Sequence, residues 1–279
     1  MLLCHRLGTV DAIPHLNGVE VDLHDALLRP QQFDEHGEVS LKTFPHPRAT
    51  RPQEHILRRL LRDGRPVFVD IDPETLDIDA SKIEEKITCH TVAIMPVHVF
   101  GNNCDFKAID AVAKAHNIPV IYDACHSVGA TYKGESVFKQ GDISVTSFHA
   151  TKMLNTAEGG GVFTLNKEID EKLRRIRFFG FENHADIVED GFNGKMTEVH
   201  AAVGLANLRY LDKALADRRE KYARYKEILG QNPEIFFQKI TTGCNYSYFP
   251  AIFKNEATAL KVVTALNSEN IYPRRKTRP

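Results

Sequence analysis

From Pro66 onward the chain alternates short apolar runs with amphipathic segments of about 12 residues, and this alternation restricts the fold more than any other feature. We expect strands over 66–72, 91–97, 118–122, 143–148 and 161–165. We expect helices over 82–87, 105–116, 167–177, 198–210 and 213–229. Alternating strands and helices build βαβ units, in which helices cover both faces of a mostly parallel sheet. The sequence therefore predicts an α/β fold.

The two ends of the chain differ from this central part. Residues 1–64 hold six of the thirteen histidines and show little apolar periodicity, apart from a short helix predicted around 54–61. Near the other end, a strand over 246–253 and a helix over 257–268 indicate a smaller α+β piece. We therefore divide the chain into an atypical segment (1–64), a large domain (65–210) and a small, incomplete domain (211–279).

Composition excludes several classes of function. The chain has 36 basic and 37 acidic side chains, whereas a nucleic-acid surface needs clustered Lys and Arg. It contains no apolar run long enough to span a membrane, and no signal-peptide pattern opens it. The five cysteines are scattered and form no CxxC motif, so we expect no metal site and a reducing cytoplasmic location.

An acid stands directly after one predicted strand, in the sequence Val120-Ile-Tyr-Asp-Ala-Cys-His126. Ligands of open α/β sheets bind outside the carboxyl ends of the strands. Asp123 and, three residues on, His126 could therefore face a bound ring. Taken alone, Asp123 is equally typical of a residue that caps the next helix.

A lysine follows the next strand, in Val145-Thr-Ser-Phe-His-Ala-Thr-Lys152. A lysine amine that is partly removed from water is a candidate nucleophile. Nearby hydroxyls, including that of Ser147, could bind a phosphate, and Gly159-Gly-Gly161 allows close approach of the backbone. A single lysine in such a place is more often a surface charge.

Together, these residues match the chemistry that pyridoxal 5′-phosphate (PLP) requires. A carboxylate keeps the pyridine nitrogen protonated, a lysine bonds to the aldehyde, and hydroxyls hold the phosphate. Three other residues keep open interpretations. His98 is more typical of a structural histidine, His149 fits a positioning or a catalytic role, and Cys125 resembles a small buried hydrophobe.

Four sequence blocks resemble the DegT/DnrJ/StrS family of PLP-dependent nucleotide-sugar aminotransferases. They are Asp-Ala-Cys-His (123–126), Ser-Phe-His-Ala-Thr-Lys (147–152), Glu-Gly-Gly (158–160) and Gly-Phe-Asn-Gly-Lys-Met-Thr-Glu-Val-His-Ala-Ala-Val-Gly (191–204). The resemblance covers about 65–274. It implies a fold-type I PLP enzyme with a large domain and a smaller α+β domain.

The resemblance also implies roles for single residues. Lys152 would bond to PLP and move a proton between the substrate carbon and the cofactor. Asp123 would pair with the pyridinium nitrogen, His126 would lie beside the ring, and Ser147 would bind the phosphate. Asn193 would reach the cofactor of the neighbouring subunit, which implies a homodimer with shared active sites. Dehydratases of the family carry histidine in place of the lysine, so Lys152 favours transamination.

Within the family, the stretch around Lys152 and Asn245-Tyr-Ser-Tyr-Phe-Pro250 resemble enzymes that act on dTDP-4-keto-6-deoxyglucose or its 3-keto isomer. The expected reaction transfers an amino group from glutamate to this ketone and serves surface polysaccharide synthesis. The carbon that receives the amine is left open between positions 4 and 3.

The N-terminal segment departs from the family pattern. Family members carry a phosphate loop and a ring-stacking aromatic before the strand that starts at Pro66, and we find neither in 1–64. Our hypothesis is that 1–64 includes translation in a shifted reading frame and that the end near Lys276–Pro279 is a second break. The alternative function is therefore an inactive remnant of such an aminotransferase.

Overall fold

The computed structural model describes residues 2–5, 64–183 and 186–275. Met1–Cys4 and Pro66–Pro279 form one compact unit, and His5–Arg65 forms a second. The helix predicted over 54–61 and the frame-shift hypothesis for 1–64 therefore fall almost wholly outside the described residues. The division at residue 210 also stays a prediction.

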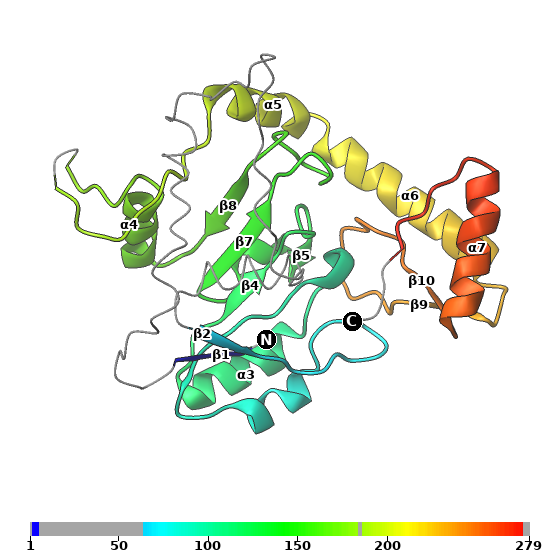
Figure 1. The fold of residues 1–279 in the computed structure, drawn as a ribbon, viewed down its shortest axis with the longest axis horizontal. Helices are drawn as coiled ribbons and strands as arrows, with labels where there is room; N and C mark the ends of the chain where they lie inside the picture. Colours follow the sequence, from blue (N-terminus) through cyan, green and yellow to red (C-terminus); the bar gives the residue numbers. More distant parts are fainter. Residues whose placement is uncertain (1, 6–63, 184–185, 276–279) are drawn as a thin grey trace, which may run out of the picture. The chain divides into compact units, whose positions relative to one another are not determined.

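The central strands form a mixed sheet. β4 (Ile121–Asp123) pairs in parallel with β7 (Ile143–Ser147), and β7 pairs antiparallel with β8 (Gly160–Phe163). Figure 1 shows these three strands as neighbouring green arrows. A second group has the order β2-β1-β3 and consists of β1 (Leu2–His5), β2 (Gly64–Val67) and β3 (Thr91–Ile94).

Parallel bridges join β3 to β4 and make the two groups of strands continuous. Ile94 bridges to Val120, and Val97 bridges to Asp123. The backbone N–H of Asp123 donates to the carbonyl of Pro96 at 2.9 Å. Proline has no N–H for a sheet ladder, and β3 ends at Ile94, three residues before the predicted end. The carboxyl ends of β4 and β7 thus lie at the same edge of the sheet.

α3 (Phe106–His116) packs against β3 and β4 and forms the main core. Asp105 caps its first turn by accepting a hydrogen bond from the N–H of Ala108 at 3.0 Å. Asn117 ends it in the left-handed conformation (φ 52°). The helix predicted over 105–116 buries one apolar face, which includes Phe106 and Ile109. The buried hydrophobic cluster comprises Ile78, Ile83, Ile94, Cys104, Phe106, Ile109, Ala113, Val120, Tyr122, Ala130 and Val137.

One predicted helix is wrong in type. The segment 82–87 forms two short 3₁₀ turns, η1 (Ala80–Lys82) and η2 (Glu84–Lys86), in place of an α-helix. The carboxylate of Asp79 caps η1 by accepting from the N–H of Ser81 at 3.0 Å. Ile83 between the two turns is fully buried, which shows that tertiary packing decides the backbone here.

Several short elements lie between the longer strands and helices. η3 (Val99–Gly101) follows β3, and β5 (Thr131–Tyr132), β6 (Glu135–Ser136) and η4 (Val137–Lys139) lie between β4 and β7. None of these four elements was predicted from the sequence, because each is only two or three residues long.

The C-terminal part is mainly helical. It comprises α4 (Lys167–Ile176), α5 (Glu198–Leu208), α6 (Leu211–Leu229), α7 (Glu256–Ser268) and the antiparallel pair of β9 (Ile235–Phe237) with β10 (Ala251–Phe253). The helices match the predicted segments within a few residues. The strand predicted over 246–253 is wrong in extent, since only its last three residues pair, and β9 was missed.

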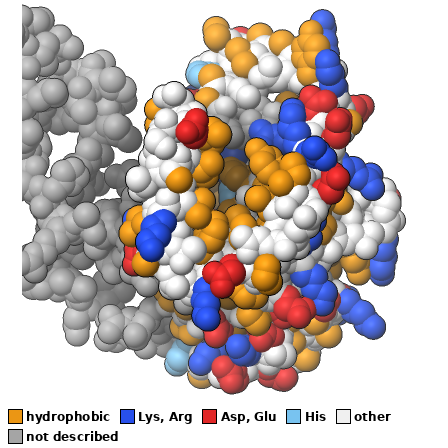
Figure 2. Space-filling model, turned by 90° about the vertical axis from the view of Figure 1, so that its right-hand side faces the viewer, with side chains coloured by type: hydrophobic (Ala, Val, Ile, Leu, Met, Phe, Trp, Pro, Cys, Tyr) orange, Lys and Arg blue, Asp and Glu red, His pale blue; other side chains and the backbone are white. Residues whose placement is uncertain are grey.

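No helix in the described ranges is long and apolar enough to cross a membrane. Figure 2 views the side of the molecule on which α7 lies and shows hydrophobic side chains gathered around a hollow. Exposed hydrophobic residues of the C-terminal part include Tyr225, Ile228, Phe236 and Leu260.

Candidate active site

A small pocket of about 60 Å³ brings together the loops that follow β4 and β7. The loop after β4 contributes His126, and the loop after β7 contributes Lys152. These two sequence-predicted residues therefore share one pocket. Its lining comprises Cys125, His126, Val128, Thr151, Lys152, Met153, Arg218, Ser247 and Tyr248.

Asp123 is the last residue of β4, and its carboxylate shapes the start of the His126 loop. Its Oδ1 accepts a hydrogen bond from the N–H of Cys125 at 3.0 Å. Burial, with the nearby Asp123 charge, raises the pKa of the Cys125 thiol to about 12. The thiol is therefore neutral at pH 7, and Cys125 lines the pocket as a half-buried, uncharged group.

Lys152 lies in a compact loop that begins at the end of β7. The hydroxyl of Ser147 accepts from the N–H of His149 at 3.2 Å, and the N–H of Lys152 donates to the carbonyl of His149 at 2.9 Å. The N–H of Thr156 donates to the carbonyl of Phe148 at 2.8 Å and closes the loop. Lys152 is half-buried and forms no ion pair with the part of the chain that the structure describes. Its amine is thus held near the pocket without a competing carboxylate partner.

The His126 ring lies between aromatic neighbours. Its centroid is 4.7 Å from that of Tyr248, and it is parallel to the ring of Phe100 at 6.3 Å. The backbone carbonyl of His126 accepts hydrogen bonds from Asn245 at 2.7 Å and from the Ser247 hydroxyl at 2.9 Å. Both the ring and the backbone of His126 therefore contact the C-terminal part.

The other two histidines considered from the sequence have clear local partners. His98 is fully buried, stacks on Tyr122 at 4.9 Å, and accepts from the N–H of Cys104 through Nδ1 at 3.2 Å. Burial lowers its pKa to about 3, so it is neutral and structural. His149 is exposed and bonds to Thr151 Oγ1 at 2.9 Å within its own loop.

Asn193 is not among the residues that line this pocket. It is exposed, its backbone bridges to Phe178, and its Oδ1 accepts a hydrogen bond from the Lys195 amine at 2.7 Å. Neither Ser147 nor Asp123 lines the pocket, although each ends a strand beside it. The roles assigned to these residues stay predictions.

Sequence reasoning missed five pocket residues, which are Val128, Met153, Arg218, Ser247 and Tyr248. The last two belong to the stretch Asn245–Pro250, which we had noted only as a sign of substrate type. Arg218 lies on the exposed side of α6, and its Nη1 donates to the carbonyl of Ser247 at 3.2 Å. No periodicity or motif singled it out, because a charged residue on a solvated helix face carries no local signal.

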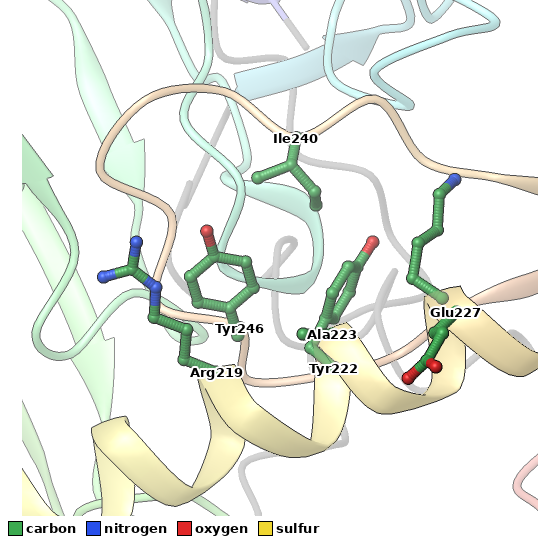
Figure 3. A pocket seen from close by; sticks show the side chains of 7 residues that line it. Arg219, Tyr222, Ala223, Glu227, Ile240 and Tyr246 are labelled. Carbon is green, nitrogen blue, oxygen red and sulfur yellow. The ribbon is translucent and has the colours of Figure 1, made fainter.

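A second, more open cavity of about 470 Å³ lies beside α6 (Figure 3). Its lining comprises Arg219, Tyr222, Ala223, Lys226, Glu227, Ile240 and Tyr246. Figure 3 shows the side chain of Tyr246 next to that of Tyr222, which belongs to α6. The centroids of the two rings are 5.1 Å apart. None of the residues predicted to act in catalysis lines this cavity.

Comparison with known proteins identifies the class to which this fold and pocket belong. The profile of the DegT/DnrJ/EryC1/StrS aminotransferase family matches residues 60–275. The chain belongs to this family, as the sequence blocks predicted. The structural neighbours have fold type I and include PLP-dependent sugar aminotransferases, so the predicted α/β fold class is confirmed.

Two curated proteins of similar sequence are sugar-modifying enzymes of this kind by name. The dTDP-4-amino-4,6-dideoxy-D-glucose transaminase of Shigella dysenteriae is 39% identical over 98% of this chain and 73% of its own length. GDP-perosamine synthase of Caulobacter vibrioides is 42% identical over 60% of this chain and 45% of its own length.

Solved structures of proteins named for nucleotide-linked sugars also resemble this chain. DesI in the presence of its TDP-sugar product has a TM-score of 0.71 at 31% identity and matches 80% of this chain. An E. coli GDP-4-keto-6-deoxy-D-mannose-3-dehydratase with bound hydrated PLP has a TM-score of 0.69 at 27% identity over 74% of this chain. This chain spans 57% and 59% of those two proteins, respectively.

The residues at the pocket fit PLP in their chemistry. A carboxylate ends one strand, a hydroxyl ends the next, and a lysine amine and an imidazole line the same pocket. Gly160 allows the backbone of β8 to approach β7, because a Cβ there would lie 2.8 Å from the carbonyl of Thr146. Among the described residues, no group of three or more His, Cys, Asp or Glu side chains could hold a metal ion.

Proposed function

We propose that this chain catalyses PLP-dependent transamination of a nucleotide-linked keto-deoxysugar, with glutamate as the amino donor. The observation that carries this proposal is the pocket shared by Lys152 and His126, next to the strand that ends at Asp123. Family membership supports the reaction type. The Shigella relative, whose name specifies dTDP-4-amino-4,6-dideoxy-D-glucose, supports dTDP-4-keto-6-deoxyglucose as the substrate.

Each side chain has a defined task in this proposal. When bound, PLP acts as an electron sink for the carbon that loses its proton. The Nζ of Lys152 anchors the cofactor and moves a proton as a general base and acid. The carboxylate of Asp123 holds a proton on the ring nitrogen, and the imidazole of His126 packs beside the ring. The hydroxyl of Ser147 donates to the phosphate.

A homodimer with shared active sites is part of the same proposal. Asn193 lies outside the pocket of its own chain, which is compatible with a role in the site of a second copy. Large hydrophobic side chains on and after α5 are exposed, including Val199 at 73% and Leu205 at 67%. Exposed apolar surface of this kind marks an interaction site. We place the protein in the cytoplasm, where nucleotide sugars and glutamate are available, and its product in surface polysaccharides such as O-antigen.

The first test is the visible absorption spectrum of the protein with PLP, before and after glutamate. We expect an absorption band that bleaches with glutamate and returns on addition of dTDP-4-keto-6-deoxyglucose, with the amino sugar detected by mass spectrometry. Lys152→Ala should lose both the band and glutamate-dependent turnover while keeping its circular dichroism in the far ultraviolet. Folded protein without a band would contradict the proposal and favour the inactive remnant.

The sugar specificity needs its own comparison. The 3-keto isomer and GDP-4-keto-6-deoxymannose serve as competing acceptors under the same conditions. Return of the band with dTDP-4-keto-6-deoxyglucose alone supports the substrate that we propose. A preference for either competitor would reject this substrate and keep the reaction class.

A further inference from the structure

The segment 238–248, which we call the C-terminal strap, is tied to the sheet side of the pocket by buried polar side chains. Gln238 donates through Nε2 to the carbonyls of Thr75 at 2.6 Å and Val99 at 3.0 Å. The amide of Asn102 accepts from the N–H of Thr241 at 2.8 Å. The strap therefore connects the C-terminal part to loops more than 100 residues earlier in the chain.

One residue of the strap, Asn245, is bonded directly to the loop that carries His126. Its side chain is 3% exposed, and Nδ2 donates to the carbonyls of His126 at 2.7 Å and Val128 at 2.8 Å. Its Oδ1 accepts from the N–H of Ser247 at 3.1 Å. Ser247 in turn donates its hydroxyl to the same carbonyl of His126 at 2.9 Å. Two side chains of the strap thus fix one backbone oxygen.

The opposite wall of this contact requires a glycine. Gly101 has a φ of +83°, and a Cβ at this position would overlap Asn245 Oδ1 and lie 2.8 Å from the carbonyl of His126. The close approach of three segments at this point thus depends on the missing side chain. The ring of Tyr248, also on the strap, contacts the His126 imidazole at 4.7 Å between centroids.

We propose that Asn245, assisted by Ser247, is a positioning residue for cofactor binding that acts through His126. This inference rests on the proposed function, in which the His126 imidazole packs beside the PLP ring. The backbone of His126 is held by two hydrogen bonds from the strap, and its ring contacts both Tyr248 of the strap and Phe100, so the C-terminal part contributes to the direction of the imidazole. Loss of these bonds removes both donors from the part-buried carbonyl of His126 and lets the imidazole reorient.

Asn103 offers a matched control for this role. It is 4% exposed, and its Nδ2 also donates to two carbonyls, those of Thr131 and Thr242, each at 2.9 Å. Asn103 therefore also joins the strap to the body of the protein with an equally buried amide. It has no hydrogen bond to His126. If Asn245 has a purely structural role, Asn245→Ala and Asn103→Ala should weaken PLP binding equally. If it is a positioning residue, Asn245→Ala should weaken PLP binding more.

The experiment measures PLP binding, the visible circular dichroism of bound PLP and thermal unfolding for the full chain and both variants. We expect Asn245→Ala to bind PLP about tenfold more weakly and to change the dichroic band. Asn103→Ala should lower the unfolding temperature by a similar amount and keep PLP affinity within about twofold. Equal losses of PLP affinity in the two variants, or an unchanged affinity in Asn245→Ala, would overturn the inference.

A milder variant and a cofactor-free measurement extend the test. Ser247→Ala removes one of the two donors, and we expect a weakening of about threefold in the same direction. Without PLP, hydrogen exchange of the backbone at 124–128 should be faster in Asn245→Ala than in Asn103→Ala. Equal exchange rates would also overturn the inference. If the unsubstituted chain binds no PLP, the proposed function fails together with the positioning role, whereas normal binding with an insensitive Asn245 refutes the positioning role alone.

Discussion

Because of Asp77, the free energy of unfolding of this protein should decrease as the pH rises from 4 to 7. Its side chain is 1% exposed, and burial raises its pKa to about 7. The N–H of Val99 and the amide of Asn102 donate to its two oxygens at 2.8 and 3.1 Å, and both contacts oppose this shift without cancelling it. The folded state therefore binds a proton that the unfolded chain has already released at the same pH.

The sign and the size of the effect follow from this difference. A group whose pKa is higher in the folded state stabilises the protein fully below its unfolded pKa of 3.8, and this contribution is lost as pH rises to about 7. A shift of about three units corresponds to about 4 kcal/mol, of which roughly 2.5 kcal/mol is lost between pH 5 and pH 8.

Urea unfolding at pH 5 and pH 8 measures this loss. We expect Asp77→Asn to show a difference between the two pH values that is smaller than that of the unsubstituted protein by roughly 2.5 kcal/mol. Asp72 is the control, because hydrogen bonds to Thr75 lower its pKa and place its titration below this pH range. Asp72→Asn should reduce the pH dependence only slightly, because the charge of Asp72 is the smallest of the causes that raise the pKa of Asp77. An equal pH dependence in Asp77→Asn and the unsubstituted protein would refute the reasoning.

Two further predictions concern the site and the core. Asp123→Asn should lower turnover, because it removes the charge that we propose holds the proton on the PLP ring nitrogen, and it should leave the unfolding temperature nearly unchanged. Steady-state kinetics and calorimetry measure these two effects. Unaltered turnover would contradict the proposed role of Asp123. Ile109→Ala, at a fully buried position of α3, should lower the free energy of unfolding by about 2–5 kcal/mol, as measured by urea titration. Leu165→Ala, at a side chain that is 75% exposed, should change it by less than about 0.5 kcal/mol, and similar losses in both variants would show that Ile109 is not a core residue.

Local patterns predicted the elements that stabilise themselves through one face. α3 combines a capping Asp105 with apolar positions at helical spacing, and both signals act within a few residues. The predicted helix over 82–87 instead forms 3₁₀ turns, because burial of Ile83 against distant parts of the chain decides its backbone. β9 was missed because three residues whose only partner is β10 give no periodic signal.

The sequence could predict those residues of the candidate site that lie at or just after the ends of strands. Asp123 and Ser147 end strands β4 and β7, and His126 and Lys152 lie in the loops that follow, so topology alone brings them near one edge of the sheet. Arg218 and Tyr248 could not be found in this way. They reach the pocket through packing of the C-terminal part, and no short-range pattern records a contact between residues so far apart in sequence.

The strap also has a consequence for the order of folding. Asn245 is 119 residues after His126, and Gln238 is 163 residues after Thr75. Contacts between such distant residues form late, because closing a long loop costs chain entropy before any contact compensates for it. During synthesis, a nascent chain that has reached Lys152 already contains Asp123, His126 and Ser147, yet the backbone carbonyl of His126 still lacks the donors that Asn245 and Ser247 provide. The cofactor pocket is therefore completed only after residues 245–248 have left the ribosome, so PLP capture belongs to the last stage of folding.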